Sequence, residues 1–540
     1  MKSPYFLILI ACLILSCNTK SKTVQPESAE NLNFSKTDIT KDKTTSEDYL
    51  QIFTLNKDEF LNMHFTLEKP LIQSLKLLAP NLTDNELLEK GSFQFSFIVD
   101  GEPIYIENLN TGAGLKASKT EQLNHTIRLI TPQQLDYWGW YLWLKFMKLG
   151  GGQDALSEGN HTLSIEVKPY IKQDSLKVGE LLAKGHITIE VPEIPIDKSL
   201  ISLQKIQPNS GWELSKDYFD ISKIEALNKK IAEGRFENIN GIVVIKEGEI
   251  LIEEYFNGET RDSLHDPRSV GKSIASTMLG IAIDDHFIKN ENALLKDFYD
   301  LKSFENYSSK KDSVSLKSLL TMSSGFLGDD SDYSSPGHEE NMYPTNNWVE
   351  FTLNLPMQKD KIMGKDFAYF TAGTVVLGDI IQMSVPNGLV SYADEKLFAP
   401  LGITNYQWEF TPQKVGNTAG GIRLRAVDFA KYGQLYKNKG LWNGKQILNK
   451  QWVEKSFDKH VQQSIDGDAY GYLFWNKTYT YNNKAYEVSF CSGNGGNKIF
   501  IFKDIPFVVV LTSSAYNTPS AHANADKIMI EYILPAILGT

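Results

Sequence analysis

Alternating apolar and polar residues dominate the first third of the chain after its N-terminal segment. The alternation covers residues 92–99, 104–107, 161–167 and 186–191, with glycine and asparagine turns between these stretches. A period of two is typical of half-buried antiparallel strands. The pattern predicts an all-β, sandwich-like accessory domain over residues 49–202, in which we identify no catalytic motif.

One aromatic segment interrupts this pattern at residues 137–146, which contain three tryptophans. Because an indole ring buries a large apolar surface, packing into the core or against another domain is the favoured interpretation. A surface on which sugar rings stack is the alternative.

Helical patterns between strand-like runs characterise the second part of the chain. Pro192 and Pro195 favour extended backbone, and we place the domain boundary after them, at residue 202. A β-hairpin is predicted at residues 241–256, and a second at 499–502 and 507–511, followed by an amphipathic helix over 521–538. These elements predict a multidomain chain whose C-terminal α/β domain, residues 203–540, has one antiparallel sheet flanked by helices.

The N-terminal segment resembles the signal peptide of a bacterial lipoprotein. An apolar run from Tyr5 to Leu15 precedes Cys17, and it is too short to span a bilayer as a helix of the mature protein. The resemblance implies a signal peptide at residues 1–17, export, and lipid attachment of Cys17 to a membrane on its periplasmic or cell-surface side. An ordinary secretory signal is the alternative. The polar residues 18–48 are predicted to form a flexible tether.

The length and composition of the chain exclude several classes of protein and of binding partner. A chain of 540 residues exceeds the size of one hydrophobic core and predicts two domains. The net charge of −11 argues against nucleic acid as a partner, and three cysteines provide no disulfide framework. The sequence has no His-Glu-x-x-His motif, so no metal or cofactor is expected. The acidic residues 329–332 are interpreted as a solvated turn in preference to a calcium loop.

The strongest chemical signal is the pair Ser269 and Lys272, directly after the first predicted hairpin. Pro267 and Ser269 mark the start of a helix, and residues three apart lie on one face of a helix. The serine hydroxyl and the lysine amine can therefore approach each other, and the helix N-terminus favours negative charge on the serine oxygen. Ser-x-x-Lys alone is a weak motif, because it recurs by chance.

Further motifs follow in order: Leu-Leu-Thr-Met-Ser-Ser-Gly at 319–325, Tyr369 with Thr371 two residues later, Ala-Gly-Gly at 419–421, and the glycine-containing runs 428–436 and 442–448. Together they resemble the serine beta-lactamase-like superfamily over about 330 residues, particularly the branch with class C beta-lactamases, carboxylesterases and aminohexanoate-oligomer hydrolases. The resemblance implies that Ser269 is a nucleophile, that Lys272 is its base, and that Tyr369 protonates the leaving group and later activates water. The other runs are interpreted as scaffold.

Two departures from the family pattern concern the substrate. Thr371 stands where beta-lactamases usually have asparagine, and residues 490–499 lack the lysine and threonine of the Lys-Thr-Gly strand. By the resemblance, the backbone amides of Ser269 and Ser492 would form the oxyanion hole. Weaker expected substrate contacts are Thr371, Gly493, Asn494 and Tyr472, the last in a predicted strand over 470–475. Cys491 is expected to be packed in the core rather than reactive.

Three functions compete on this evidence. The first is an exported serine hydrolase that acts on a small ester or amide through an acyl-enzyme on Ser269. The second is a beta-lactam or cell-wall peptide hydrolase, which the missing Lys-Thr-Gly residues disfavour. The third is a non-catalytic binding or sensor lipoprotein, which the retention of Ser269, Lys272 and Tyr369 disfavours. The substrate and the purpose of the accessory domain cannot be read from the sequence.

Overall fold

The computed structural model describes residues 31–38, 43–56, 58–132, 138–463 and 465–539. The expected signal peptide, Cys17 and the first part of the expected tether lie outside these residues. The chain divides into two compact units, Met1–Glu193 and Ile194–Thr540. The boundary lies earlier than the predicted residue 202, because residues after 194 already pack on the second unit: the Asn228 side-chain amide donates a hydrogen bond to the Ile201 carbonyl (3.2 Å).

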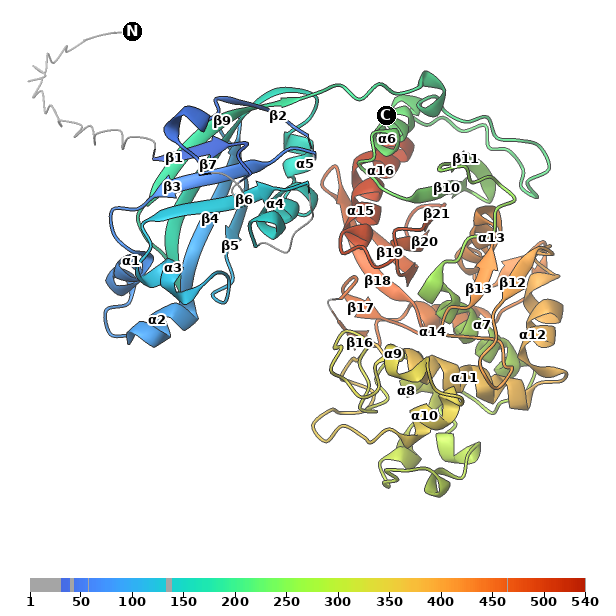
Figure 1. Ribbon diagram of the computed structural model, residues 1–540. Helices are drawn as coiled ribbons and strands as arrows, with labels where there is room; N and C mark the ends of the chain where they lie inside the picture. Colours follow the sequence, from blue (N-terminus) through green and yellow to red (C-terminus); the bar gives the residue numbers. More distant parts are fainter. Residues whose placement is uncertain (1–30, 39–42, 57, 133–137, 464, 540) are drawn as a thin grey trace, which may run out of the picture. The chain divides into compact units, whose positions relative to one another are not determined.

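The first unit contains nine strands among its described residues, in two sheets (Figure 1). The sheets have the orders β1-β3-β6 and β2-β9-β7-β4-β5, with β8 paired to β7. The strands are β1 (Leu32–Ser35), β2 (Ile52–Thr54), β3 (Leu61–Thr66), β4 (Gly91–Val99), β5 (Glu102–Asn108), β6 (Asn124–Ile130), β7 (Gly159–Lys172), β8 (Leu176–Val178) and β9 (Ala183–Val191). The helices are α1 (Leu71–Leu78), α2 (Asp84–Lys90), α3 (Lys116–Thr120), α4 (Trp138–Lys148) and α5 (Gly152–Ala155). The inward side chains of both sheets form one apolar core, so the predicted sandwich-like arrangement is confirmed.

The predicted tether is wrong at residues 32–35, which form β1. Leu32 and Phe34 are 2% and 0% exposed and place β1 in the smaller sheet. Two buried apolar residues at a spacing of two suffice for an edge strand when β3 supplies the pairing partner. Because polar residues surround them, the alternation typical of a strand was too short to recognise in the sequence. The four alternating stretches, in contrast, correspond to β4, β5, β7 and β9.

The second unit is built on one eight-stranded sheet with the order β11-β10-β21-β20-β19-β18-β17-β16. Its strands are β10 (Ile239–Lys246), β11 (Glu249–Tyr255), β16 (Val461–Gln462), β17 (Ala469–Tyr470), β18 (Trp475–Tyr481), β19 (Lys484–Gly493), β20 (Asn497–Phe502) and β21 (Phe507–Ser513). Four short strands form two separate pairs, β12 (Tyr406–Trp408) with β13 (Ile422–Leu424) and β14 (Leu441–Trp442) with β15 (Lys445–Gln446). The helices are α6 (Ile221–Ala232), α7 (Gly271–Asp284), α8 (Leu316–Leu320), α9 (Glu339–Met342), α10 (Trp348–Asn354), α11 (Thr371–Ser384), α12 (Gly388–Ala393), α13 (Ala426–Lys437), α14 (Lys450–Phe457), α15 (Ala521–Ile528) and α16 (Leu534–Leu538).

The two ends of this unit meet in the sheet, as predicted. In Figure 1 the green hairpin β10–β11 lies beside the red strands β20 and β21, and β10 pairs antiparallel with β21. The predicted helix over 521–538 is interrupted: a π-helical turn, Met529–Ile533, separates α15 from α16. None of the described helices is long and apolar enough to cross a membrane.

Helices cover both faces of the sheet next to β19 and β20. Gly433 of α13 faces Ile499 and Val508, and a Cβ atom at this glycine would come within 2.8 Å of both side chains. Ile499 is paired with Cys491, so α13 covers the face to which Cys491 belongs. α15 lies on the opposite face, where its Asp526 pairs with Lys477 of β18 (2.9 Å).

Candidate active site

Ser269 lies in a 3₁₀ turn, η3 (Arg268–Val270), that leads directly into α7. Arg268 has a φ angle of 53°, a left-handed conformation that costs a non-glycine residue about 1–2 kcal/mol. Its guanidinium lies 4.4 Å from the ring centroid of Tyr516 and 3.4 Å from the Asp266 carboxylate. These contacts hold the turn that presents Ser269, and backbone strain of this kind gathers at functional sites.

The predicted pair is brought together. The Lys272 side chain is buried, with 1% of the residue exposed, and its Nζ donates hydrogen bonds to Ser269 Oγ (2.7 Å) and to the Ala419 carbonyl (2.7 Å). An ammonium or amine held by two acceptors has little freedom of position. Ser269 itself is partly exposed, so a substrate can reach its hydroxyl while Lys272 stays enclosed.

Tyr369 completes the group. Lys272 Nζ lies 5.3 Å from the centroid of the Tyr369 ring, and the ring stacks on Trp475 at 5.5 Å. Burial raises the pKa of the Tyr369 phenol, while the Lys272 charge and the Ser269 hydroxyl oppose this rise. At neutral pH the phenol is therefore protonated and can act as a proton donor.

Two loops fix the backbone of Tyr369. Met322 accepts hydrogen bonds from the residues on both sides, through its carbonyl to the Ala368 amide (2.8 Å) and through Sδ to the Phe370 amide (3.2 Å). This confirms that residues 319–326 pack beside the site. Asp330 donates its amide proton to the Tyr369 carbonyl (2.7 Å), and its carboxylate accepts from the amide of Thr371 (2.7 Å).

Asp330 thus has a structural task that the sequence did not reveal. Its second carboxylate oxygen accepts from the Glu339 amide at the start of α9 (2.8 Å), so one side chain ties the acidic loop to both α9 and α11. Burial raises the pKa of this carboxyl, and the Glu339 charge raises it further. The interpretation of residues 329–332 as a solvated turn is wrong for Asp330. Among the described residues, no group of three or more His, Cys, Asp or Glu could hold a metal ion.

Ala419 and Gly420 are functional neighbours that we had assigned to the scaffold. Ala419 supplies the second acceptor for Lys272. Gly420 has a φ angle of 149°, and a Cβ atom there would lie 2.6 Å from the Arg268 carbonyl and 3.1 Å from the Ser269 amide nitrogen. Only glycine allows this approach. The consecutive Ala-Gly-Gly residues at 419–421 were the sequence signal from which this role could have been predicted.

The end of β19 forms the other wall. A Cβ atom at Gly493 would lie 3.1 Å from the Ser269 amide nitrogen, so the strand passes directly beside the serine. The last pair between β18 and β19 joins Trp475 to Phe490, which leaves residues 491–493 paired only with β20. The Glu487 carbonyl points toward β20, where it accepts from the Lys503 amide (2.9 Å).

Backbone direction alternates along a strand, so the amide of Ser492 points to the open edge rather than to β20. The Ser492 amide stays a prediction for the oxyanion hole. Asn494 follows in the turn after β19. The Asn494 side chain is held by Asn517 (2.7 Å).

The side chain of Ser492 belongs to the opposite face of the sheet. Its Oγ donates to Asp466 (2.6 Å) and accepts from Lys498 Nζ (2.8 Å), and Lys498 also forms an ion pair with Asp466. Lys477 is a further partner of Asp466 (3.2 Å). The contact between the Ser492 side chain and this buried charged cluster was not visible in the sequence.

Two of the expected substrate contacts, Tyr472 and Thr371, have buried side chains. Tyr472 is 1% exposed and packs between Trp452 (5.2 Å) and His460 (4.6 Å), so it belongs to the core. The predicted strand over 470–475 is interrupted, because residues 471–474 connect the end of β17 to the start of β18. Thr371 is fully buried at the start of α11.

Cys491 is buried as expected. Burial raises the pKa of its thiol to about 12, which disfavours a reactive thiolate.

A comparison with protein families, which is independent of this geometry, covers the same residues. The Beta-lactamase family model matches residues 228–532, which is more than half of the chain and includes Ser269, Lys272 and Tyr369. The chain belongs to the beta-lactamase family. A comparison with curated proteins finds no match.

Solved structures of the beta-lactamase type are similar at low identity. They include a protein assigned as a 6-aminohexanoate-dimer hydrolase from Bacillus anthracis (20% identity, 56% of this chain and 79% of that chain, TM-score 0.46). They also include a penicillin-binding protein homologue from Caulobacter crescentus (13%, 61% and 98%, TM-score 0.46) and a beta-lactamase from Mycobacterium bovis (15%, 56% and 97%, TM-score 0.39). Similarities at this level do not indicate a substrate.

The structure agrees with our interpretation of residues 428–436 as scaffold. Asp428 is fully buried and pairs with Arg425 (2.7 Å) and Lys431 (2.9 Å). Gly433 permits the close packing of α13 on the sheet. These residues hold the helical layer and do not approach Ser269.

Proposed function

We propose that the second unit hydrolyses ester or amide bonds through an acyl-enzyme on Ser269. The observation that carries the proposal is the 2.7 Å hydrogen bond between Lys272 Nζ and Ser269 Oγ at a strained turn, with the Tyr369 phenol facing the same pair. Nucleophile, base and proton donor lie together, and this is the arrangement that acyl transfer requires.

In the first step, Lys272 in its neutral form takes the proton of Ser269 as Oγ attacks the substrate carbonyl. The tetrahedral oxyanion receives hydrogen bonds from the Ser269 amide and from an amide at the open edge of β19. As the intermediate collapses, the carbonyl–heteroatom bond breaks and the leaving alcohol or amine takes a proton from Tyr369. The proton first taken by Lys272 then restores the phenol.

Deacylation repeats these steps with water. Tyr369 passes its proton to the neutral Lys272 as it accepts one from the water that attacks the acyl carbonyl, and Lys272 then protonates the departing Ser269 oxygen. The reaction releases the carboxylic acid, and the three side chains return to their starting protonation states.

An ester or amide substrate is favoured over a penicillin. The Lys-Thr-Gly pattern has a lysine on this strand, but residues 490–493 here are Phe, Cys, Ser and Gly, and the Cys491 thiol is buried and neutral. The nearest lysine of β20, Lys498, is on the opposite face and paired with Asp466. This strand therefore offers no cation to a penicillin carboxylate.

The test is intact-mass spectrometry of the chain after exposure to a fluorophosphonate, to p-nitrophenyl acetate and to a penicillin, with peptide mapping of each adduct. We expect an adduct on Ser269 from the first two reagents. Ser269→Ala should abolish it. Ser273→Ala, one turn further along α7, removes only a hydroxyl that donates to the Leu473 carbonyl (2.7 Å) and should keep it. A penicillin adduct would favour the cell-wall function, and undiminished labelling of Ser269→Ala would refute the nucleophile.

The role of Tyr369 is tested by leaving-group dependence. Tyr369→Phe preserves the ring on Trp475 and removes the acid. The acylation burst with p-nitrophenyl acetate should change little, because p-nitrophenolate leaves without protonation, whereas acylation by an alkyl ester should slow by about 10²–10⁴-fold. Equal losses on both substrates would contradict the assignment.

We also propose that the chain is exported and anchored through a lipid on Cys17, on the basis of the apolar run that precedes it. Cys17→Ala should shift the protein from the membrane fraction to the soluble exported fraction. Retention in the membrane fraction would refute the anchor.

A further inference from the structure

The first unit contains a pocket of about 460 Å³ that the proposed hydrolase chemistry does not use. Its lining includes Trp140, Trp143 and Met147 of α4. These residues lie at spacings of three and four, so they share one face of the helix. Ligand sites typically measure about 300–1,000 Å³ and combine an apolar wall with a few polar groups.

The helix that carries the indoles is rigidly seated. Phe146 is fully buried and stacks on Phe97 of β4 at 4.4 Å. A Cβ atom at Gly139 would lie 2.3 Å from the Arg128 carbonyl, so α4 packs directly on β6. Trp143 is 8% exposed, whereas Trp140 is only partly buried. Core packing, our favoured interpretation of the aromatic segment, therefore describes Phe146 but leaves Trp140 unexplained.

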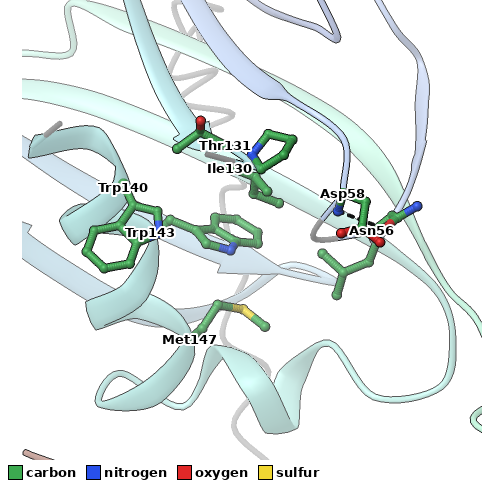
Figure 2. Close-up of a pocket in the computed structure, with 9 residues that line it drawn as sticks. Asn56, Asp58, Ile130, Thr131, Trp140, Trp143 and Met147 are labelled. Atoms are coloured by element: carbon green, nitrogen blue, oxygen red, sulfur yellow. Dashed lines mark hydrogen bonds between the residues drawn. The ribbon is translucent and has the colours of Figure 1, made fainter. Parts of the chain in front are cut away.

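Polar groups face these indoles across the pocket. Figure 2 shows Trp140 and Trp143 on one side and Asn56 and Asp58 on the other. The Asp58 amide donates to Asn56 Oδ1 (2.9 Å), which fixes the turn between β2 and β3. The side chains of Asn56 and Asp58 are exposed where they line the pocket, so the amide can donate and the carboxylate can accept hydrogen bonds there.

A third polar group is Thr131, at the end of β6. It lines the pocket and is 4% exposed, and within the described part of the chain its hydroxyl has no hydrogen-bond partner. A buried hydroxyl without a partner costs free energy in the empty pocket and gains from a ligand that supplies one. The pocket thus contains apolar faces opposite unfilled hydrogen-bonding capacity.

We propose that this pocket binds a neutral saccharide, with a pyranose ring stacked on the partly exposed indole of Trp140 and its hydroxyls bonded to Asn56 and Asp58. A pyranose has an apolar face of C–H groups and a polar rim of hydroxyls, which matches the two sides of the pocket. An acyl chain with an anionic head is disfavoured because Asp58 would repel it. A quaternary ammonium needs several aromatic faces around it, and here the indoles lie on one side only.

The experiment is isothermal titration calorimetry of the chain carrying both units with a panel of neutral tetrasaccharides of glucose, N-acetylglucosamine, galactose, mannose and xylose. Laurate and choline serve as the anionic acyl and cationic probes. At least one tetrasaccharide should bind, and Trp140→Ala should weaken it by roughly tenfold or more. Asp58→Asn should weaken it by a similar factor, since hydrogen bonds to a charged group contribute about 1.5–3 kcal/mol.

Two variants control for these changes. Asp174→Asn removes an exposed carboxylate of the same unit, and Tyr218→Ala removes a 75% exposed ring of the other unit. Both should bind like the parent chain. Absence of binding across the panel, binding that survives Trp140→Ala, or binding of laurate or choline in place of a saccharide would overturn the proposal. Fluorophosphonate labelling of Ser269 should be unchanged in every variant, so the result is independent of the proposed hydrolase function.

Discussion

Replacing Asp466 by asparagine is the sharpest test of the charged cluster behind the candidate site. Lys498 has a fully buried side chain, and its two hydrogen-bond acceptors in the cluster are Asp466 and the Ser492 hydroxyl. Asp466→Asn removes the charge that compensates this buried ammonium. Breaking a buried pair in this way costs about 3–5 kcal/mol, because the remaining charge stays desolvated.

The expected shift in melting temperature follows from the size of the second unit. An entropy of unfolding of about 2.1 cal/mol/K per residue gives roughly 0.7 kcal/mol/K for a unit of this size, so the loss corresponds to about 4–7 °C. Urea unfolding followed by limited proteolysis separates the two units and measures the free energy directly. Glu454→Gln is the matched control, because its pair with Lys450 is exposed (3.8 Å) and contributes at most about 0.5 kcal/mol.

The pKa shifts of Lys498 and Asp466 predict how the stability loss depends on pH. Burial lowers the pKa of Lys498, and Asp466 opposes this, so the substitution lowers that pKa further. The unfolded lysine, with a pKa of about 10.4, then binds more protons than the folded one, and stability rises as pH increases toward 10. Lys498 and its neighbours also hold the pKa of Asp466 well below its ordinary value, so the parent chain loses this contribution as pH falls below about 4. The deficit of the variant should therefore be largest between about pH 5 and 8.

A second substitution makes the reasoning refutable. Lys498→Met leaves Asp466 paired with Lys477 (3.2 Å), so it should cost less than Asp466→Asn. The double variant should be more stable than Asp466→Asn alone, because the uncompensated charge is gone. A loss below about 1 kcal/mol for Asp466→Asn, or additive losses in the double variant, would show that the pair does not act as a buried ion pair. Acylation of Ser269 should slow with Asp466→Asn, since the Ser492 strand edge loses its support.

Three further outcomes follow from the site. Lys272→Arg places here a guanidinium that cannot accept a proton at neutral pH, so fluorophosphonate labelling should slow by about 10²–10⁴-fold in a stopped time course. Gly420→Ala should slow labelling and lower the melting temperature, because its Cβ meets the Arg268 carbonyl, whereas Gly444→Ala, at a φ of 77° with open space around it, should affect labelling little. Cys491 should resist iodoacetamide at pH 8 in the folded chain and react after urea denaturation, because burial raises its thiol pKa to about 12.

Local patterns predicted most of the fold. The hairpins at both ends of the second unit were visible because buried strands and their turns leave a local signal, and β10 and β21 pair accordingly. The β1 strand was missed because an edge strand needs only two inward residues, Leu32 and Phe34, when a partner strand supplies the rest of the ladder. The break between α15 and α16 depends on packing rather than on periodicity.

The residues of the candidate site also fall into two groups: those that a local sequence pattern predicted and those that it did not. Ser269 and Lys272 are three residues apart on one turn, so their contact follows from helix geometry, and the motif order added Tyr369. Asp330 and Ala419 could not be found in this manner. Ala419 acts through its backbone carbonyl and Asp330 through a carboxylate that caps distant backbone amides. Such contacts leave no pattern in the neighbouring sequence.

This division explains why Tyr369 and the serine pair depend on different parts of the chain. Ser269 and Lys272 are fixed by one local turn, whereas the position of Tyr369 is set by Met322 and Asp330 from two separate loops. A change in either loop should therefore alter proton donation to the leaving group while the hydrogen bond between Ser269 and Lys272 persists. Acylation by activated esters, which need no such donation, should tolerate loop changes that abolish amide hydrolysis. On the proposed mechanism, the loops that hold the phenol set the substrate range of this unit, and the Ser269 nucleophile is common to every substrate.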